Sequence, residues 1–257
     1  MPFDVAEALR DLGFRCPPAA IASLLAEATK TKLSPAQVCE RLAKLERRER
    51  DARNLARRTR SATLGPFATL DTFDWNHPRN VERSLYERLL GLDFIEHGEN
   101  VLLRGPSGVG KTTLAQNLAL AALNAGYHVR FSTLAAALTD LLKQESLPAL
   151  DRRVRRHVQP SLLVLDELGY LPCDSRSADL LYTVLSRRHL LRSTVITTNL
   201  AFKDWGGVFP GAACVGALVD RFVERCHVLD IDADSWRQKR ALQPPIERPR
   251  PKQVTKQ

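Results

Sequence analysis

Eight consecutive residues have the types and the spacing of a phosphate-binding loop. They follow the pattern GxxxxGK[ST] and are Gly105, Pro106, Ser107, Gly108, Val109, Gly110, Lys111 and Thr112. The three glycines allow a sharp turn that points backbone N–H groups at a chain of phosphates. Lys111 would reach the β- and γ-phosphates, and the Thr112 hydroxyl would bind Mg²⁺. Together with Thr113, which follows in the same helix, these residues predict a site for ATP and Mg²⁺.

Two acids at the end of an apolar segment would supply the second half of such a site. Residues 162–165 are all apolar and predict a buried strand, and Asp166 and Glu167 follow directly. Ligands bind at the carboxyl ends of strands in open α/β sheets. There Asp166 would hold Mg²⁺ through water, and Glu167 would accept a proton from the attacking water. The alternative is that both acids only cap the next helix. Beside a phosphate loop, the pair instead indicates hydrolysis of ATP.

Three further polar residues are candidates for contact with the γ-phosphate. Asn199 follows the β-branched segment 195–198 and could orient the water, although Asn at a strand end is ordinarily a turn residue. Arg221 lies in a late helical segment and Arg237 lies near the end of the chain. Surface arginines are usually without a role, but the transition state of phosphoryl transfer requires positive charge. We therefore expect these two arginines to supply it.

The elements that must position these residues alternate between helix and strand. Strands separated by helices imply right-handed crossovers and a parallel sheet covered on both faces. The expected fold class is α/β, a P-loop domain with a central parallel sheet flanked by helices. Its expected strands are residues 100–104, 129–132, 161–165, 194–198 and 227–231, and its helices are residues 81–92, 111–125, 134–144, 178–190 and 215–225.

The chain divides by composition into four regions. Residues 1–60 have apolar residues at helical spacing and predict a small basic helical domain, in which Ser34 and Pro35 mark a helix start. Residues 61–80 read as a linker, 81–242 as the ATPase domain, and the Pro-rich tail 243–257 as disordered. The aromatic residues Phe67, Phe73 and Trp75 of the linker would either pack on the next domain or wall an adenine pocket.

A net charge of +9, from 38 basic and 29 acidic residues, favours a polyanionic partner, with nucleic acid ahead of membrane. Basic residues concentrate in residues 41–60 and 152–156. Such a run is often a solvated helix face with i,i+4 ion pairs. The excess of arginine favours contact with phosphates, because a guanidinium binds phosphate with two donors.

The five cysteines are scattered and form no CxxC pair, which predicts reduced thiols rather than a zinc site or disulfides. The N-terminus has no signal peptide pattern, and no apolar run is long enough to span a bilayer. We therefore expect a cytoplasmic protein.

Taken together, the motifs resemble those of AAA+ ATPases, and more specifically those of IstB-type transposition helper ATPases of bacterial insertion sequences. The resemblance covers roughly residues 5–240. Beyond the phosphate loop, the matching stretches are TLDTFDW (69–75), LDELGYLP (165–172), SRR (186–188), STVITTNL (193–200), FKDWG (202–206), VDRFV (219–223) and DSWR (234–237). One departure is Trp236, where the family usually has tyrosine.

The resemblance implies several properties beyond ATP binding. The family is similar to the DnaC helicase loaders and to the DnaA initiator. Its members bind double-stranded DNA largely without sequence choice, form ATP-dependent homo-oligomers and activate a partner transposase. By the same resemblance Asn199 is a sensor-1 residue, Arg221 an arginine finger acting on a neighbouring subunit, and Arg237 a sensor-2 residue.

Three other functions remain open at this point. A helicase loader of the DnaC type would share the ATPase domain and differ in its partner. A small-molecule P-loop kinase would need a lid with phosphate-binding arginines, which the sequence does not show. A nucleotide-dependent switch would bind ATP with negligible turnover.

Overall fold

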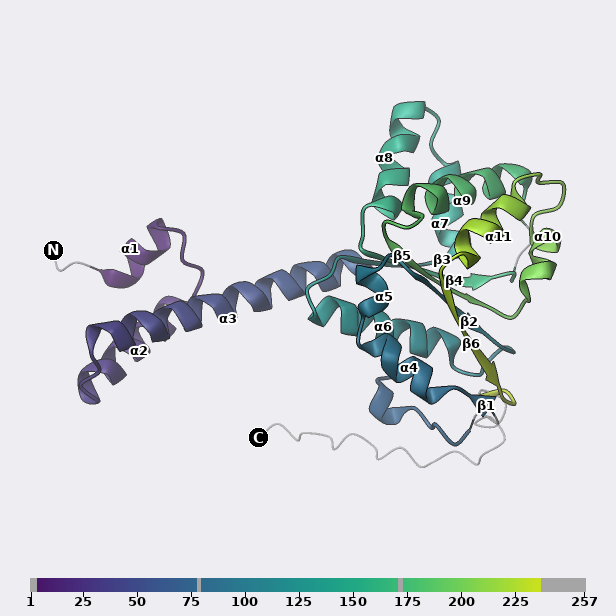
Figure 1. Ribbon diagram of the computed structural model, residues 1–257. Coiled ribbons are helices and arrows are strands. Elements are labelled where there is room, and N and C mark those ends of the chain that lie inside the picture. The colour runs from purple at the N-terminus through teal and green to yellow at the C-terminus, as the bar shows by residue number, and fades with distance from the viewer. Residues whose placement is uncertain (1–3, 78–79, 171–172, 237–257) are drawn as a thin grey trace, which may run out of the picture. The chain divides into compact units, whose positions relative to one another are not determined.

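The computed structural model describes residues 4–77, 80–170 and 173–236 (Figure 1). The chain forms two compact units, Met1–Thr63 and Leu64–Gln257. Arg237, expected near the γ-phosphate, and the tail 243–257 lie outside the described residues. Within the described part of the chain, no helix is both long and apolar enough to cross a membrane. All five cysteines are free thiols.

The N-terminal unit consists of three helices, α1 (Val5–Asp11), α2 (Pro18–Lys30) and α3 (Pro35–Ala62). The start of α3 is fixed by a capping box. Ser34 accepts a hydrogen bond from the Gln37 backbone N–H, and the Gln37 side chain accepts one from the Ser34 N–H. Pro35 occupies the first turn, where its missing N–H costs nothing. The helix start predicted at Ser34 and Pro35 is confirmed.

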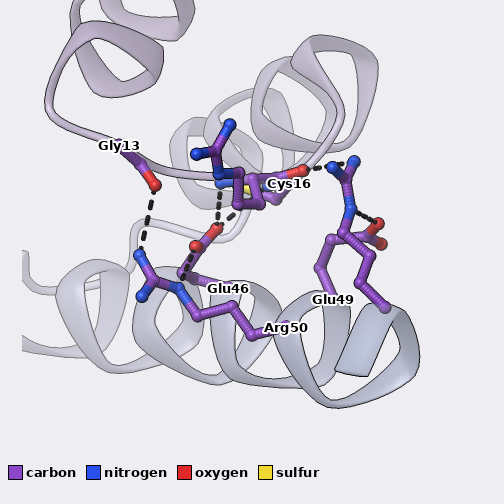
Figure 2. Close-up of polar contacts among 7 residues, drawn as sticks. Gly13, Cys16, Glu46, Glu49 and Arg50 are labelled. Carbon is purple, nitrogen blue, oxygen red and sulfur yellow. Dashed lines mark hydrogen bonds and ion pairs between the residues drawn. The ribbon is translucent and has the colours of Figure 1, made fainter. Parts of the chain in front are cut away.

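A buried carboxylate fastens the loop between α1 and α2 to α3 (Figure 2). Glu46 accepts hydrogen bonds from the backbone N–H groups of Arg15 (2.7 Å) and Cys16 (2.9 Å) and from Arg50 Nε (2.5 Å). Arg50 also donates to the Gly13 carbonyl at 3.1 Å. Burial raises the pKa of Glu46, but these hydrogen bonds outweigh burial and lower the pKa to about 2.

Several charges of the basic segment 41–60 are therefore engaged within the unit. The pairs Lys44–Glu40, Arg50–Glu46 and Arg53–Glu49 have i,i+4 spacing on α3. Arg53 also donates to the carbonyl of Arg15 at 3.0 Å. Among the described residues, Arg47, Arg48 and Arg60 are exposed and form no ion pair. The solvated-face interpretation accounts for about half of this run, and these three arginines remain available to a partner.

The second unit is built on a six-stranded sheet in the order β1-β6-β2-β5-β4-β3. Five strands are parallel, and the two-residue β1 pairs antiparallel with β6 at one edge. The sequence did not predict β1, because two residues carry no periodic pattern. The strands are β1 (Asn80–Val81), β2 (Asn100–Arg104), β3 (Val129–Thr133), β4 (Leu162–Leu168), β5 (Ser193–Thr198) and β6 (Cys226–Asp232).

Helices cover both faces of this sheet (Figure 1). One face carries α4 (Arg83–Leu90), α5 (Asp93–Glu96) and α6 (Lys111–Asn124). The other carries α7 (Leu134–Leu142), α8 (Leu147–Val158), α9 (Ser175–Arg188) and α11 (Val215–Val223). Shorter elements are η1 (Leu70–Thr72), η2 (Phe202–Asp204) and α10 (Trp205–Val208). From the sequence, no helix was predicted for residues 152–156, which were described only as a basic run. They lie in α8, where Leu147, Leu150, Val154 and Val158 recur at helical spacing, a pattern that was overlooked beside the basic run.

A buried arginine ties the end of α9 to the amino ends of the central strands. Arg188 is 1% exposed. Its guanidinium donates to the Thr194 hydroxyl at 3.0 Å and to carbonyl oxygens of His157 (3.0 Å), Val158 (2.9 Å), Pro160 (2.8 Å), Ser161 (3.4 Å) and Ser193. Burial lowers its pKa to about 9. Because these acceptors belong to the end of α8, to the loop before β4 and to β5, Arg188 fixes the starts of the two strands that carry the site's polar residues.

Candidate nucleotide-binding site

The phosphate loop connects β2 to α6, and side chains from other segments of the chain pack closely against it. Gly108 and Gly110 have φ of +82° and +99°, which side chains rarely adopt. A Cβ at Gly108 would lie 2.4 Å from Ser235 Oγ, and one at Gly110 would lie 2.6 Å from Phe73 Cε2. Both glycines are therefore required by backbone conformation and by neighbouring side chains. The loop precedes the N-terminus of a helix, where backbone N–H groups and the helix dipole favour an anion.

Two residues at the start of α6 carry the polar groups expected to bind phosphate and metal. Lys111 is buried, and its Nζ donates to the carbonyls of Gly105 (2.8 Å) and Pro106 (2.7 Å) in its own loop. Thr112 Oγ1 donates to the Asp166 carboxylate, 3.1 Å from Oδ1 and 3.0 Å from Oδ2. A hydroxyl and a carboxylate in contact form the kind of oxygen donor set that Mg²⁺ requires. The residues present therefore fit the metal predicted from the sequence.

The two acids lie within β4 rather than after it, and they differ in environment. Asp166 is 3% exposed, whereas Glu167 is exposed and lines the cavity described below. Glu167 has φ of +66°, a left-handed conformation that is uncommon for a residue with a side chain. The expected strand ended at 165, and the observed strand continues to Leu168 with a shift in its pairing to β5. The acids are therefore held by the sheet itself.

A cavity of about 240 Å³ collects these residues. One wall consists of residues 108–113 of the loop and of α6, and another consists of Glu167, Tyr170 and Thr197 at the carboxyl ends of β4 and β5. The remaining wall comes from residues between Ala68 and His77, together with Trp236. A site bounded by a phosphate loop, the Glu167 carboxylate and aromatic rings, with Asp166 bonded to Thr112 at its wall, has the composition needed to bind a nucleotide.

Two of the three aromatic residues named for segment 61–80, Phe73 and Trp75, divide between the two roles that the sequence left open, and His77 joins Phe73. Phe73 and His77 line the cavity, and the His77 ring contacts the Trp236 ring with centroids 4.7 Å apart. Trp236 is held over the loop because its backbone N–H donates to the Gly108 carbonyl at 3.1 Å. Trp75 instead packs against Tyr86 of α4, with ring centroids 5.5 Å apart. Phe73 and His77 are therefore placed to contact a base, and Trp75 is a packing residue.

Two of the residues expected at the γ-phosphate lie outside this cavity. Asn199 is exposed and lines a separate groove with Gly105, Pro106 and Ser107. Arg221 lies on α11 with its guanidinium carbon 5.2 Å from the centre of the Tyr182 ring. The structure thus brings together Lys111, Thr112, Asp166 and Glu167 and leaves these two residues apart from them.

Among the cavity residues that sequence reasoning missed are His77, Thr197 and Tyr170. Thr197 belongs to a β-branched segment that predicted only a strand, and no local pattern distinguished it from its neighbours. Tyr170 entered only within a resembling stretch, yet its hydroxyl lies 2.8 Å from Ser107 Oγ of the phosphate loop. The predicted strand ended at 165, so Tyr170 was five positions beyond it, and only the continuation of β4 to Leu168 places this residue at the sheet edge where ligands bind.

This fold and this site define an ATP-binding P-loop domain of the AAA+ class. Solved structures with the same fold include a DnaC helicase loader, with a TM-score of 0.51 and 23% identity, covering 64% of this chain and 97% of that one. Another is AMPPCP-bound DnaA from Aquifex aeolicus, with a TM-score of 0.55 and 21% identity, covering 67% of this chain and 52% of that one. The predicted α/β architecture is confirmed.

The chain belongs to the family of IstB-like ATP binding proteins, whose family model matches residues 8–244. One relative, from insertion sequence IS21 of Pseudomonas aeruginosa and named as an ATP-binding protein, is 34% identical over 85% of this chain and 83% of its own length. A second, from insertion sequence IS5376 of Geobacillus stearothermophilus, is 31% identical over 84% of this chain and 86% of its own. The family resemblance read from the motifs is confirmed.

Proposed function

We propose that this chain hydrolyses ATP and uses the ATP-bound state to assemble as a homo-oligomer on double-stranded DNA, where it activates a partner transposase. The observation that carries the proposal is the position of Glu167, which lines one cavity with Lys111 and Thr112 beside Asp166. A chain that only bound nucleotide would not require an exposed carboxylate there. Membership of a family whose named relatives come from insertion sequences supports the link to transposition.

The chain's own residues would act in hydrolysis as follows. The N–H groups of the loop and of the first turn of α6 bind the phosphates, and Lys111 exchanges its contacts with Gly105 and Pro106 for contacts with phosphate oxygens. Thr112 and Asp166 would hold Mg²⁺, which supplies charge neutralisation at the phosphates. Glu167 orients the attacking water and accepts its proton.

The surface of α8 supports DNA as the partner. Arg152, Arg153, Arg155 and Arg156 line a shallow groove of about 420 Å³. Arg155 pairs with Asp151 and Arg153 with Asp140. Within the described residues Arg152 and Arg156 are exposed and form no ion pair. Arginines without protein partners are suited to phosphate contacts that position a protein on DNA without reading its sequence.

The positions of Asn199 and Arg221 support a site shared between subunits. Arg221 lies outside its own cavity, as a residue that completes a neighbour's site would. We therefore propose Arg221 as the arginine finger and Asn199 as a contact to the γ-phosphate made on assembly. Arg237, beyond the described residues, is proposed as a sensor on the basis of the family resemblance alone.

The decisive experiment measures oligomer size and ATP hydrolysis with and without ATP and duplex DNA. Glu167→Gln should bind ATP normally, lose hydrolysis by about 100-fold and remain assembled. Arg221→Ala should keep ATP binding and lose assembly-dependent hydrolysis, whereas the nearby exposed Arg225→Ala should behave as wild type. A wild type that binds ATP and assembles without turnover would instead establish a nucleotide switch.

The transposition role is tested separately from the ATPase. Pull-down from purified components should retain the transposase encoded with the insertion sequence and not a replicative helicase. Retention of the helicase alone would replace the transposition proposal with a DnaC-like loader, and would leave the ATPase proposal in place.

A further inference from the structure

The Thr197 hydroxyl forms hydrogen bonds with the Asp166 carboxylate and with the Glu167 backbone. Thr197 lies in β5 and is 1% exposed. Its Oγ1 donates to Asp166 Oδ1, and it accepts a hydrogen bond from the Glu167 backbone N–H at 2.9 Å. A threonine hydroxyl has one proton to donate, which the carboxylate accepts, and a lone pair that the N–H uses. The donor and acceptor capacities of this side chain are thus matched to Asp166 and Glu167.

These two hydrogen bonds lie at a β-bulge. Leu165 pairs with Ile196 and Leu168 pairs with Thr198, so Asp166 and Glu167 of β4 stand opposite the single residue Thr197 of β5. At the C-terminal end of the bulge, Thr198 Oγ1 donates a hydrogen bond to the Leu168 carbonyl at 2.8 Å. A bulge of this kind bends a strand and re-aims a side chain.

The bulge decides where the Glu167 carboxylate lies. In a regular strand, successive side chains point to opposite faces of the sheet, so adjacent acids would be separated. Here Asp166 is buried against Thr112, and Glu167 lines the same cavity as Thr112. The left-handed φ of Glu167 is unfavourable for a residue with a side chain and must be compensated by its surroundings. The hydrogen bond from the Glu167 N–H to Thr197 is one such compensation.

We propose that Thr197 is a positioning residue for ATP hydrolysis, whose hydroxyl holds the bulge that directs Glu167 into the cavity and keeps Asp166 against Thr112 at its wall. This inference rests on the hydrolysis proposed above. It also assigns to Thr197 a role beside the acids that Asn199 does not share, since Asn199 lines a separate groove.

A purely structural role for Thr197 makes a different prediction. A buried hydroxyl can matter only because it stabilises the sheet, and its loss would then lower the unfolding temperature without changing turnover. Thr194 provides the matched control. It is also 1% exposed and also in β5, and its hydroxyl accepts a hydrogen bond from Arg188 Nε at 3.0 Å, at the other end of the strand.

The test uses the full-length chain with the substitutions Thr197→Val, Thr197→Ser and Thr194→Val. Valine keeps the branched shape and removes the hydroxyl, and serine restores it. With MgATP, Thr197→Val should lower kcat by about 10- to 100-fold with KM changed less than about threefold. Thr197→Ser should keep kcat within about threefold of wild type. Thr194→Val should lower the unfolding temperature and leave kcat unchanged.

A second measurement does not depend on turnover. The Mg²⁺ concentration for half-maximal binding of a fluorescent, non-hydrolysable ATP analogue should rise by about three- to tenfold in Thr197→Val, because Asp166 loses a group that orients it. Unchanged kcat and unchanged Mg²⁺ dependence in folded Thr197→Val would overturn the inference, and so would an equal loss of kcat in Thr194→Val. A wild type without ATPase activity would overturn the proposed hydrolysis instead, and the Mg²⁺ titration would still decide whether Thr197 orients Asp166.

Discussion

Tyr170 and Ser107 join the two halves of the nucleotide site through their hydroxyl groups. Ser107 belongs to the phosphate loop, and Tyr170 follows the bulge in β4 and lines the cavity. Because Tyr170 is 46% exposed, the contact lies on the solvent-facing side of the cavity. Gly169 precedes it with φ of +96°, and a Cβ there would lie 2.5 Å from Leu200 Cδ1. The tyrosine is therefore presented by a turn that only glycine can make.

We expect this contact to slow the release of bound nucleotide. Tyr170→Phe and Ser107→Ala should each weaken ATP binding by about two- to tenfold, which corresponds to one hydrogen bond. Stopped-flow measurement of nucleotide dissociation checks this. The double variant should be no weaker than either single variant, because both remove the same bond. Additive losses would show that the two hydroxyls act independently.

The site residues that could be predicted from the sequence are those that belong to a motif with a fixed local spacing. The phosphate loop from Gly105 to Thr112 and the acids Asp166 and Glu167 belong to this group, and the structure brings Lys111, Thr112 and both acids together. Thr197 and Phe73 could not be found in this way. Thr197 matters because a register shift places it opposite both acids, and Phe73 matters because its ring lies against Gly110.

At the scale of elements, α8 combines an exposed basic face with a buried histidine. His157 is 1% exposed, and burial together with the charge of Arg130 lowers its pKa to about 4. Within the described part of the chain, neither ring nitrogen has a hydrogen-bond partner, and Nε2 is 3.9 Å from an Asp140 carboxylate oxygen. The folded protein therefore favours the neutral ring.

This histidine predicts a loss of stability in mild acid. The folded pKa of His157 lies below its unfolded value of 6.5, so its contribution is fully present above pH 6.5 and is lost as the pH falls toward 4. Between pH 7 and 4.5 the free energy of unfolding should fall by about 2 to 3 kcal/mol on this account. Urea unfolding at both values should show a smaller change in His157→Met. An identical pH dependence in the variant would assign the loss to other groups.

The elements themselves were predicted better than their ends. Five of the six strands and the helices around them follow from apolar runs and helical spacing. The end of β4 was placed too early, at 165, because polar residues normally end a buried strand and here the bulge continues it to Leu168. Helix α9 begins at Ser175 rather than at 178, because Asp174 accepts a hydrogen bond from the Ser177 N–H and caps it.

At the scale of the whole molecule, the net charge of +9 overstates the basic surface that a partner can use. Arg188 is buried, Arg50 and Arg53 hold the loop between α1 and α2, and Arg104 forms two hydrogen bonds of 2.6 Å with Asp230. Arg152 and Arg156 on α8 are among the exposed arginines that remain.

DNA binding should therefore depend on α8 more than on charge in general. Arg152→Ala combined with Arg156→Ala should weaken duplex DNA binding and reduce the slope of log K against log salt by about 2. Fluorescence anisotropy over a salt series measures both effects. The matched control is Arg83→Ala with Arg88→Ala, an equal change of charge on α4, which lies across the sheet from α8 (Figure 1). Equal effects of the two pairs would mean that no particular surface binds the DNA.

The strand order also determines when the central sheet can form during translation. The phosphate loop directly follows β2. The two strands that flank β2 in the sheet, β5 and β6, both come much later in the chain. During translation β2 has no partner until residues 193–198 have emerged, whereas the N-terminal unit is already complete. At about 5–20 residues per second the unfinished sheet persists for several seconds. A chain released before β5 is made would contain every residue of the phosphate loop. It would still lack the strand that places Thr197 beside Asp166 and Glu167. We therefore expect such a truncated product to lack a functional ATP site.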